Sequence, residues 1–264
     1  MKAPTKVLLV SSVLLAAMGI ASVTLAKPAA SPPPTKLVQQ LTDYLKSLQQ
    51  FSYRAQVSYD EPATGGKKVT HSFTVKTSVH RPDRIRVSAA GDEVNKDFYL
   101  NGSSIVLYDK TAKVYAVMPV PSDIEGALAK AHKEYNLKVA LTDLASPQLY
   151  QHLSKNLPGA RNLGTEKVQG MPCYHLVFHR DNREMQLWIN TGKKPLLRKL
   201  VISEKTPQGE LTWTALLSDW NVAAKFDNSL FTFVAPAGVK KIRFLPVHQA
   251  AASGQAKQPA QGGK

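Results

Sequence analysis

The strongest constraint on the fold of this chain is a two-residue alternation of apolar and polar side chains, which recurs in many short segments. Successive side chains of a β-strand point to opposite faces, so each segment is typical of a half-buried antiparallel strand. Turn sequences such as Gln169-Gly170 and Asp181-Asn182 separate neighbouring segments. About ten or eleven strands in meander order are more than a flat open sheet tolerates. We therefore expect a strongly curved antiparallel sheet, a half-barrel.

One stretch, KDFYLNGSSIVLYDKTAKVYAVMP (residues 96–119), departs from simple alternation because its strands carry apolar side chains on both faces. An antiparallel sheet with one face in water would need only one apolar face. We expect a helix to cover one face of this stretch and strand or loop packing to cover the other.

Helical spacing of apolar residues appears in two regions. Residues 35–48 place five apolar residues on one stripe: Leu37, Leu41, Tyr44, Leu45 and Leu48. In the middle of the chain, residues 121–154 are typical of helices, and Ser122 with Glu125 predicts a capping box. We expect the helices to pack on the concave face of the sheet, in a single-domain α+β fold.

The two ends of the chain differ in composition from the rest. Residues 1–26 have the charged start, apolar run and small-residue cleavage pattern of a secretory signal, and an uncleaved anchor stays open as an alternative. No cysteine stands at the cleavage point, so we do not expect a lipoprotein. Residues 27–34 form a proline-rich linker, residues 35–246 the folded domain and residues 247–264 a disordered tail.

Net charge bears on the choice of partner. The formal charge is +15 at pH 7, and removal of Lys2 and Lys6 with the signal leaves about +13, spread along the chain. A basic surface favours lipid head groups, acidic polysaccharide or acidic protein, although a merely soluble basic surface is an equal alternative. Export and the absence of a binding motif argue against nucleic acid.

No motif of a known catalytic or cofactor site occurs in the sequence. Cys173 and His175 share a strand face, but a lone cysteine more often behaves as a small buried hydrophobe than as a nucleophile. His175 and His179 lie about 13 Å apart along a strand, too far to ligate one metal. We expect no enzyme, no cofactor and no metal. Trp188 alternates with inward residues and should point outward.

Seven segments carry a resemblance to a known family: residues 80–86 (HRPDRIR), 98–109 (FYLNGSSIVLYD), 168–178 (VQGMPCYHLVF), 186–189 (QLWI), 196–202 (LLRKLVI), 217–221 (LSDWN) and 229–246 (SLFTFVAPAGVKKIRFLP). With the first helix they span residues 37–246 and resemble an uncharacterised family of predicted periplasmic proteins. That family is part of the LolA-like superfamily of lipoprotein carriers and LppX- and RseB-like proteins.

The resemblance implies a periplasmic protein that binds a lipid or lipidated protein between a curved sheet and a helical lid. The cavity would be lined by the dry strand faces: Tyr53, Val57, Phe73, Val75, Ile85, Val87, Phe98, Leu100, Leu176, Phe178, Leu187, Ile189, Leu211 and Trp213. The lid would present Ile124, Leu128, Leu144, Leu149 and Leu153. Two alternatives stay open: these residues fill a dry core, or the fold serves as an envelope sensor or protein-interaction module.

Overall fold

The fold is built on one twelve-stranded sheet. The computed structural model describes residues 31–155, 157–207 and 209–246. Strand order across the sheet is β12-β6-β5-β4-β3-β2-β1-β11-β10-β9-β8-β7. The strands are β1 (Gln50–Pro62), β2 (Lys68–His80), β3 (Arg84–Gly91), β4 (Asn95–Asn101), β5 (Ser104–Asp109), β6 (Val114–Pro119), β7 (Arg161–Val168), β8 (Met171–Arg180), β9 (Arg183–Asn190), β10 (Leu197–Thr206), β11 (Gly209–Asn221) and β12 (Lys240–Ile242).

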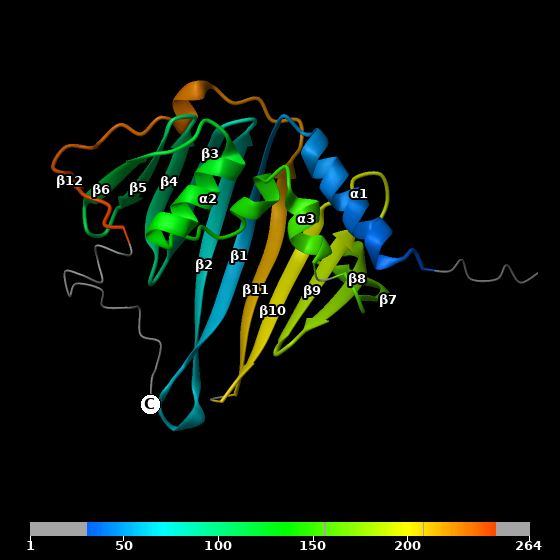
Figure 1. Ribbon diagram of the computed structural model, residues 1–264. Helices are drawn as coiled ribbons and strands as arrows, with labels where there is room; N and C mark the ends of the chain where they lie inside the picture. Colours follow the sequence, from blue (N-terminus) through cyan, green and yellow to red (C-terminus); the bar gives the residue numbers. More distant parts are fainter. Residues whose placement is uncertain (1–30, 156, 208, 247–264) are drawn as a thin grey trace, which may run out of the picture. The chain divides into compact units, whose positions relative to one another are not determined.

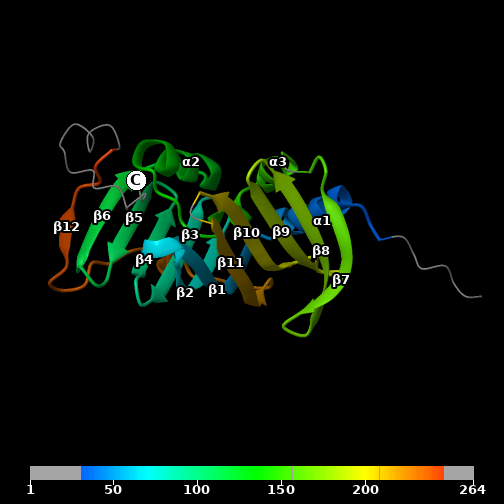
Figure 2. The ribbon, with the colours of Figure 1, turned by 90° about the horizontal axis from the view of Figure 1, so that it is seen from below.

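The sheet consists of two meanders that meet in the middle. Strands β1 to β6 follow one another along the sheet, as do β7 to β11, and β1 pairs with β11 to join the two series. The sheet curves strongly, and the helices lie on its concave side (Figures 1 and 2). The curved antiparallel sheet with helices on its concave face is thus confirmed. The strand count was low by one, because β12 is a three-residue strand without alternation that pairs in parallel with β6.

Three α-helices and a short 3₁₀ helix cover the concave face: α1 (Pro34–Ser47), α2 (Ile124–Tyr135), η2 (Thr142–Ala145) and α3 (Leu149–Ser154). Their buried side chains belong to one hydrophobic core with the inward residues of the sheet. The predicted capping box at Ser122 is wrong, since the side chain of Asp123 accepts from the backbone N–H of Gly126 and caps α2. Glu125 instead accepts a hydrogen bond from the Ser146 hydroxyl.

The stretch with two apolar faces is covered on both sides, as expected. Phe98 and Leu100 face the concave core. On the convex side the chain after β11 crosses back over the sheet (Figure 2), and the ring of Phe233 packs on those of Tyr99, Tyr108 and Tyr115 at centroid distances of 5.5, 5.3 and 5.0 Å. This crossing segment continues into β12, beyond which Phe244 contacts Tyr135 of α2. The covering element on the convex side is therefore a loop.

A second, smaller hydrophobic cluster lies on the convex face around Trp188. Trp188 points away from the concave core, as its alternation predicts, yet only 4% of it is exposed. The imidazole of His175 stacks on the indole at 4.1 Å, and the ammonium of Lys199 lies 4.3 Å from the ring centroid on the neighbouring strand. The indole N–H donates to the carboxylate of Glu166. Trp188 is therefore a buried residue of the convex face, not an exposed contact residue.

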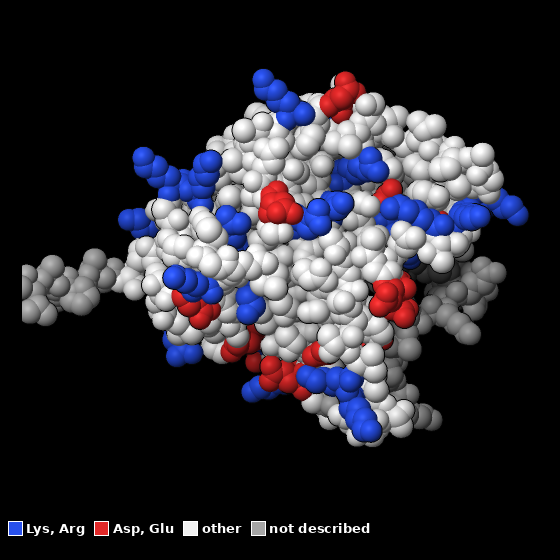
Figure 3. Space-filling model, turned by 180° about the vertical axis from the view of Figure 1, so that it is seen from behind, with Lys and Arg blue, Asp and Glu red and all other residues white. Residues whose placement is uncertain are grey.

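Basic and acidic side chains are interspersed on the convex face. Figure 3 shows Lys and Arg scattered over it with Asp and Glu between them. The buried Asp97, for example, forms ion pairs with Lys110 at 2.7 Å and with Arg86 at 3.6 Å. None of the helices in the described ranges is long and apolar enough to cross a membrane.

Candidate functional site

An apolar pocket of about 510 Å³ lies between the sheet and the helices. Its floor is formed by inward residues of β9, β10 and β11: Met185, Leu187, Leu197, Leu200, Ile202 and Trp213. Its roof comes from α1, η2, α3 and the segment before η2: Leu41, Lys138, Val139, Ala140, Leu141, Asp143, Leu144, Leu149 and Leu153. Most of these side chains are aliphatic, so the pocket suits a hydrocarbon ligand.

A second apolar pocket, of about 230 Å³, lies over β2 to β5. It is lined by Phe73, Val75, Val87, Ala89, Val94, Lys96, Phe98 and Leu107, together with Lys138, Val139 and Ala140. The last three residues line both pockets. Residues 138–140 therefore form a partition between two apolar pockets on the concave face.

Backbone geometry and one buried hydrogen bond hold the partition in place. Asn136 ends α2 in the left-handed region at φ 49°, a common way for a helix to end. Leu141 also has a positive φ, 65°, which is unusual for a leucine and indicates local strain held by the surrounding structure. The carbonyl of Leu141 accepts a hydrogen bond of 2.8 Å from the buried hydroxyl of Tyr53 on β1.

The roof has a second attachment to the sheet through Arg81, at the β2–β3 turn. Its guanidinium donates to the carbonyl of Ala145 at 2.6 Å and to that of Leu48 at 3.1 Å. A cation that satisfies backbone carbonyls at the end of α1 and of η2 orders both elements. Arg81 therefore positions the roof, and together with Tyr53 it ties η2 to the sheet at both ends.

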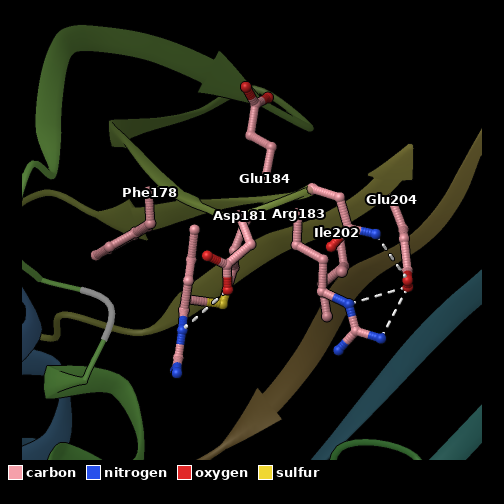
Figure 4. Close-up of a pocket in the computed structure, with 9 residues that line it drawn as sticks. Phe178, Asp181, Arg183, Glu184, Ile202 and Glu204 are labelled. Atoms are coloured by element: carbon pink, nitrogen blue, oxygen red, sulfur yellow. Dashed lines mark hydrogen bonds and ion pairs between the residues drawn. The ribbon is translucent and has the colours of Figure 1, made fainter. Parts of the chain in front are cut away.

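A polar pocket at the β8–β9 turn, the mouth, adjoins the larger apolar pocket. The mouth has a volume of about 490 Å³ and is lined by Phe178, Arg180, Asp181, Asn182, Arg183, Glu184, Met185, Ile202 and Glu204. Met185 and Ile202 line both spaces. Figure 4 shows the pairing of Arg183 with Glu204, whose Nη2 and Oε2 atoms lie 2.8 Å apart. A charged rim at an apolar pocket keeps the opening hydrated while the interior stays apolar.

A polar pocket of about 350 Å³ lies on the outer side of the roof, between α2, η2 and α3. Glu125 interacts there with the Ser146 hydroxyl and with His152 at 3.4 Å. Although part of Asp143 is exposed, loss of water around its carboxyl raises the pKa, and the neighbouring His152 and Lys138 side chains act in the opposite sense. Within residues 31–155, 157–207 and 209–246, no group of His, Cys, Asp and Glu is placed to hold a metal ion.

Cys173 and His175 do not form a nucleophilic pair. The thiol is fully buried beside Val168 and Trp188 and donates weakly to the carbonyl of Met171. Burial raises the pKa of the thiol, which disfavours the reactive thiolate. The imidazole of His175 is hydrogen-bonded to Gln186 at 2.8 Å. The geometry favours a structural role for both side chains.

The residues that the sequence proposes as cavity lining are divided between pockets and core. Seven strand residues line a space: Leu187 and Trp213 in the larger pocket, Phe73, Val75, Val87 and Phe98 in the smaller, and Phe178 at the mouth. Six others lie buried in the core: Tyr53, Val57, Ile85, Leu100, Leu176 and Ile189. Leu211 lies half-buried on β11 and lines none of the pockets described here.

The proposed lid residues are divided in the same way. Leu144, Leu149 and Leu153 line the larger apolar pocket. Leu128 lines the outer polar pocket, and Ile124, the first residue of α2, is buried in the core. Sequence reasoning missed the partition, because Lys138-Val139-Ala140 has no helical or strand periodicity. It also left out Met185, Leu200 and Ile202 as lining residues, although their two-residue alternation on β9 and β10 could have found them.

Comparison with known proteins yields one family and several distant structures. A family model described as "Predicted periplasmic protein (DUF2092)" matches residues 35–245. No curated protein matches the chain. An uncharacterized conserved protein from Thermus thermophilus is 9% identical, with a TM-score of 0.47, over 79% of this chain and 97% of that one.

Two further solved structures also resemble this chain at low sequence identity. Lipoprotein LppX from Mycobacterium tuberculosis is 13% identical, with a TM-score of 0.37, over 73% of this chain and 97% of its own. A LolA superfamily protein from Nitrosomonas europaea is 8% identical, with a TM-score of 0.37, over 77% of this chain and 99% of its own. None of these similarities identifies a ligand for this chain.

Proposed function

Because the chain belongs to the DUF2092 family of predicted periplasmic proteins, we propose that it is a non-enzymatic binding protein or carrier for a lipid or for the acyl chains of a lipidated protein. The observation that carries this proposal is the apolar pocket of about 510 Å³ between the sheet and the helices. Its volume lies in the usual range of small-molecule sites, about 300–1,000 Å³. A periplasmic location, as the family description predicts, and the formal charge of +15 would suit a ligand from an anionic envelope surface.

The pocket provides the free energy that such a ligand needs. Each methylene moved from water to an apolar wall contributes about 0.8 kcal/mol, so several buried methylenes give useful affinity. Polar side chains are few in the lining, chiefly Lys138 and Asp143, and both belong to the roof. The floor of β9 to β11 is therefore a hydrocarbon surface, and the polar end of a ligand would lie at the roof or the mouth.

The alternative of an envelope sensor or protein-interaction module would be favoured by a filled concave face and an exposed patch around Trp188. Trp188 is 4% exposed, and the concave face holds two apolar pockets. An envelope protein partner becomes the next hypothesis if the lipid experiment fails.

The proposal is tested by native mass spectrometry of the protein purified from its own envelope without detergent, followed by lipid extraction. We expect a stoichiometric lipid adduct. Leu200→Glu places a carboxylate in the floor of the pocket and should abolish the adduct. Leu163→Glu is the matched control, because Leu163 is 53% exposed on β7, and it should leave the adduct intact. A clean apo mass, with no uptake of a fluorescent fatty acid, would refute the proposal.

A further inference from the structure

A lysine lies where the two apolar pockets meet. Lys138 lines the larger pocket, the smaller pocket and also the polar pocket on the outer side of the roof. Val139 also appears in all three linings, so Lys138 is the charged residue of the two that the three pockets share. Lys138 is exposed and lies in the partition, where the linings of the two apolar pockets and of the outer polar pocket meet.

The charge of Lys138 is not neutralised by an ion pair. Lys96, the other lysine that lines the smaller pocket, pairs with Asp109 at 3.5 Å. Lys138 forms no such pair with any residue of the described part of the chain. Of the nearby acids, Glu125 is engaged by Ser146 and His152, and Asp143 interacts electrostatically with Lys138 without forming an ion pair with it. An exposed cation next to two apolar walls is available to an anionic group of a ligand.

The arrangement of the pockets constrains the apolar part of that ligand. Residues 138–140 line both the pocket of about 510 Å³ and the pocket of about 230 Å³. One hydrocarbon chain that filled both volumes would have to pass these residues. Two chains joined at a polar centre would instead occupy one pocket each and meet at the partition, beside Lys138.

Resting on the lipid-binding function above, we propose that the ligand is an anionic lipid with two apolar chains, one in each pocket, whose headgroup is bound by Lys138. The ammonium supplies a charge-assisted hydrogen bond to the headgroup. The two pockets provide the apolar burial, and the unequal volumes allow one chain to be buried more fully than the other.

The experiment uses the full mature protein and defined probes. Dissociation constants are measured by displacement of a fluorescent fatty acid with dioleoyl phosphatidylglycerol, dioleoyl phosphatidylcholine and single-chain oleoyl lysophosphatidylglycerol. The variant is Lys138→Gln, and the control is Lys133→Gln, an exposed lysine in the last turn of α2 that lines neither apolar pocket. We expect the wild type to bind the two-chain anionic lipid most tightly, and Lys138→Gln to weaken that binding about tenfold.

Phosphatidylcholine binding should change little in Lys138→Gln, and the control should match the wild type for all three lipids. Equal affinity of Lys138→Gln and wild type for phosphatidylglycerol would overturn the role of Lys138. Equal affinity of the wild type for the one-chain and two-chain anionic lipids would overturn the two-pocket ligand. Either result leaves the lipid-binding function standing, whereas failure of every probe, the fatty acid included, refutes that function itself.

Discussion

The hydroxyl of Tyr53 donates a buried hydrogen bond of 2.8 Å to the carbonyl of Leu141, 88 residues further along the chain. Tyr53 lies on β1, in the middle of the sheet, and Leu141 directly follows the partition formed by residues 138–140. Burial raises the pKa of the tyrosine hydroxyl, so it stays protonated and able to donate. This bond sets the position of the roof over the sheet.

Replacement Tyr53→Phe removes the donor and leaves the carbonyl of Leu141 without its partner. The ring stays, and with it the contact to Trp220 at 4.8 Å, so the change isolates the hydrogen bond. We expect the free energy of unfolding to fall by about 1–3 kcal/mol. Urea unfolding measures this loss, and hydrogen exchange should show faster opening of residues 136–145. An unchanged exchange rate there would mean that Tyr53 does not hold the roof.

Asp60 predicts a pH dependence of stability. Its carboxylate accepts from the Thr70 hydroxyl at 2.8 Å, the Lys68 ammonium at 3.1 Å and the backbone N–H of Thr212 at 3.1 Å, joining β1 to β2 and β11. These hydrogen bonds, that of Thr70 first, lower the pKa of the carboxyl in the folded state. The contribution to stability is therefore present above about pH 3.9, the unfolded value, and is lost as the pH falls through the folded value.

Asp60→Asn should accordingly lower the free energy of unfolding at pH 7, and the difference from the wild type should shrink below about pH 3. Urea unfolding at the two pH values measures both. Asp92→Asn serves as the control, because Asp92 is exposed. A difference that stays constant between the two pH values would show that the carboxylate charge is not its source.

Cys173 should be unreactive in the folded protein. The thiol is fully buried, so a reagent cannot reach it. Burial also raises its pKa, which disfavours the reactive thiolate. We expect no reaction with a thiol-specific reagent at pH 8 in the native state and one thiol per chain after unfolding in urea. Rapid native labelling would instead show that the sheet opens between β7 and β8 near its edge.

The sequence predicts the sheet well because alternation reports directly which side of a strand is dry. Leu187, Phe98 and Val87 were placed correctly on the inner face by this rule alone. The rule does not predict burial on the convex face, where side chains of neighbouring strands can cover a residue. Trp188 was expected to point outward, either as a contact residue or packed beneath a loop. It does point outward, but His175 and Lys199 on neighbouring strands cover it, and only the pairing of strands brings them there.

The division between pocket and core could not be predicted in the same way. Leu176 and Leu187 are equivalent in the alternation and both are buried, but only Leu187 lines the larger pocket. What separates them is the path of the roof, which depends on left-handed backbone at Asn136 and Leu141 and on the long-range bond from Tyr53. Short segments without periodicity carry no signal for such a path.

The pairing of β1 with β11 determines when the pocket can exist. Val57 on β1 pairs with Ala215 on β11, so the two meanders meet only after nearly the whole domain has been synthesised. The pocket takes its roof partly from α1, through Leu41, and its floor from β9 to β11, through residues such as Leu200. Each meander can assemble from local contacts, whereas their union is a late, non-local step. The pocket is thus incomplete until β11, the last long strand, has joined β1.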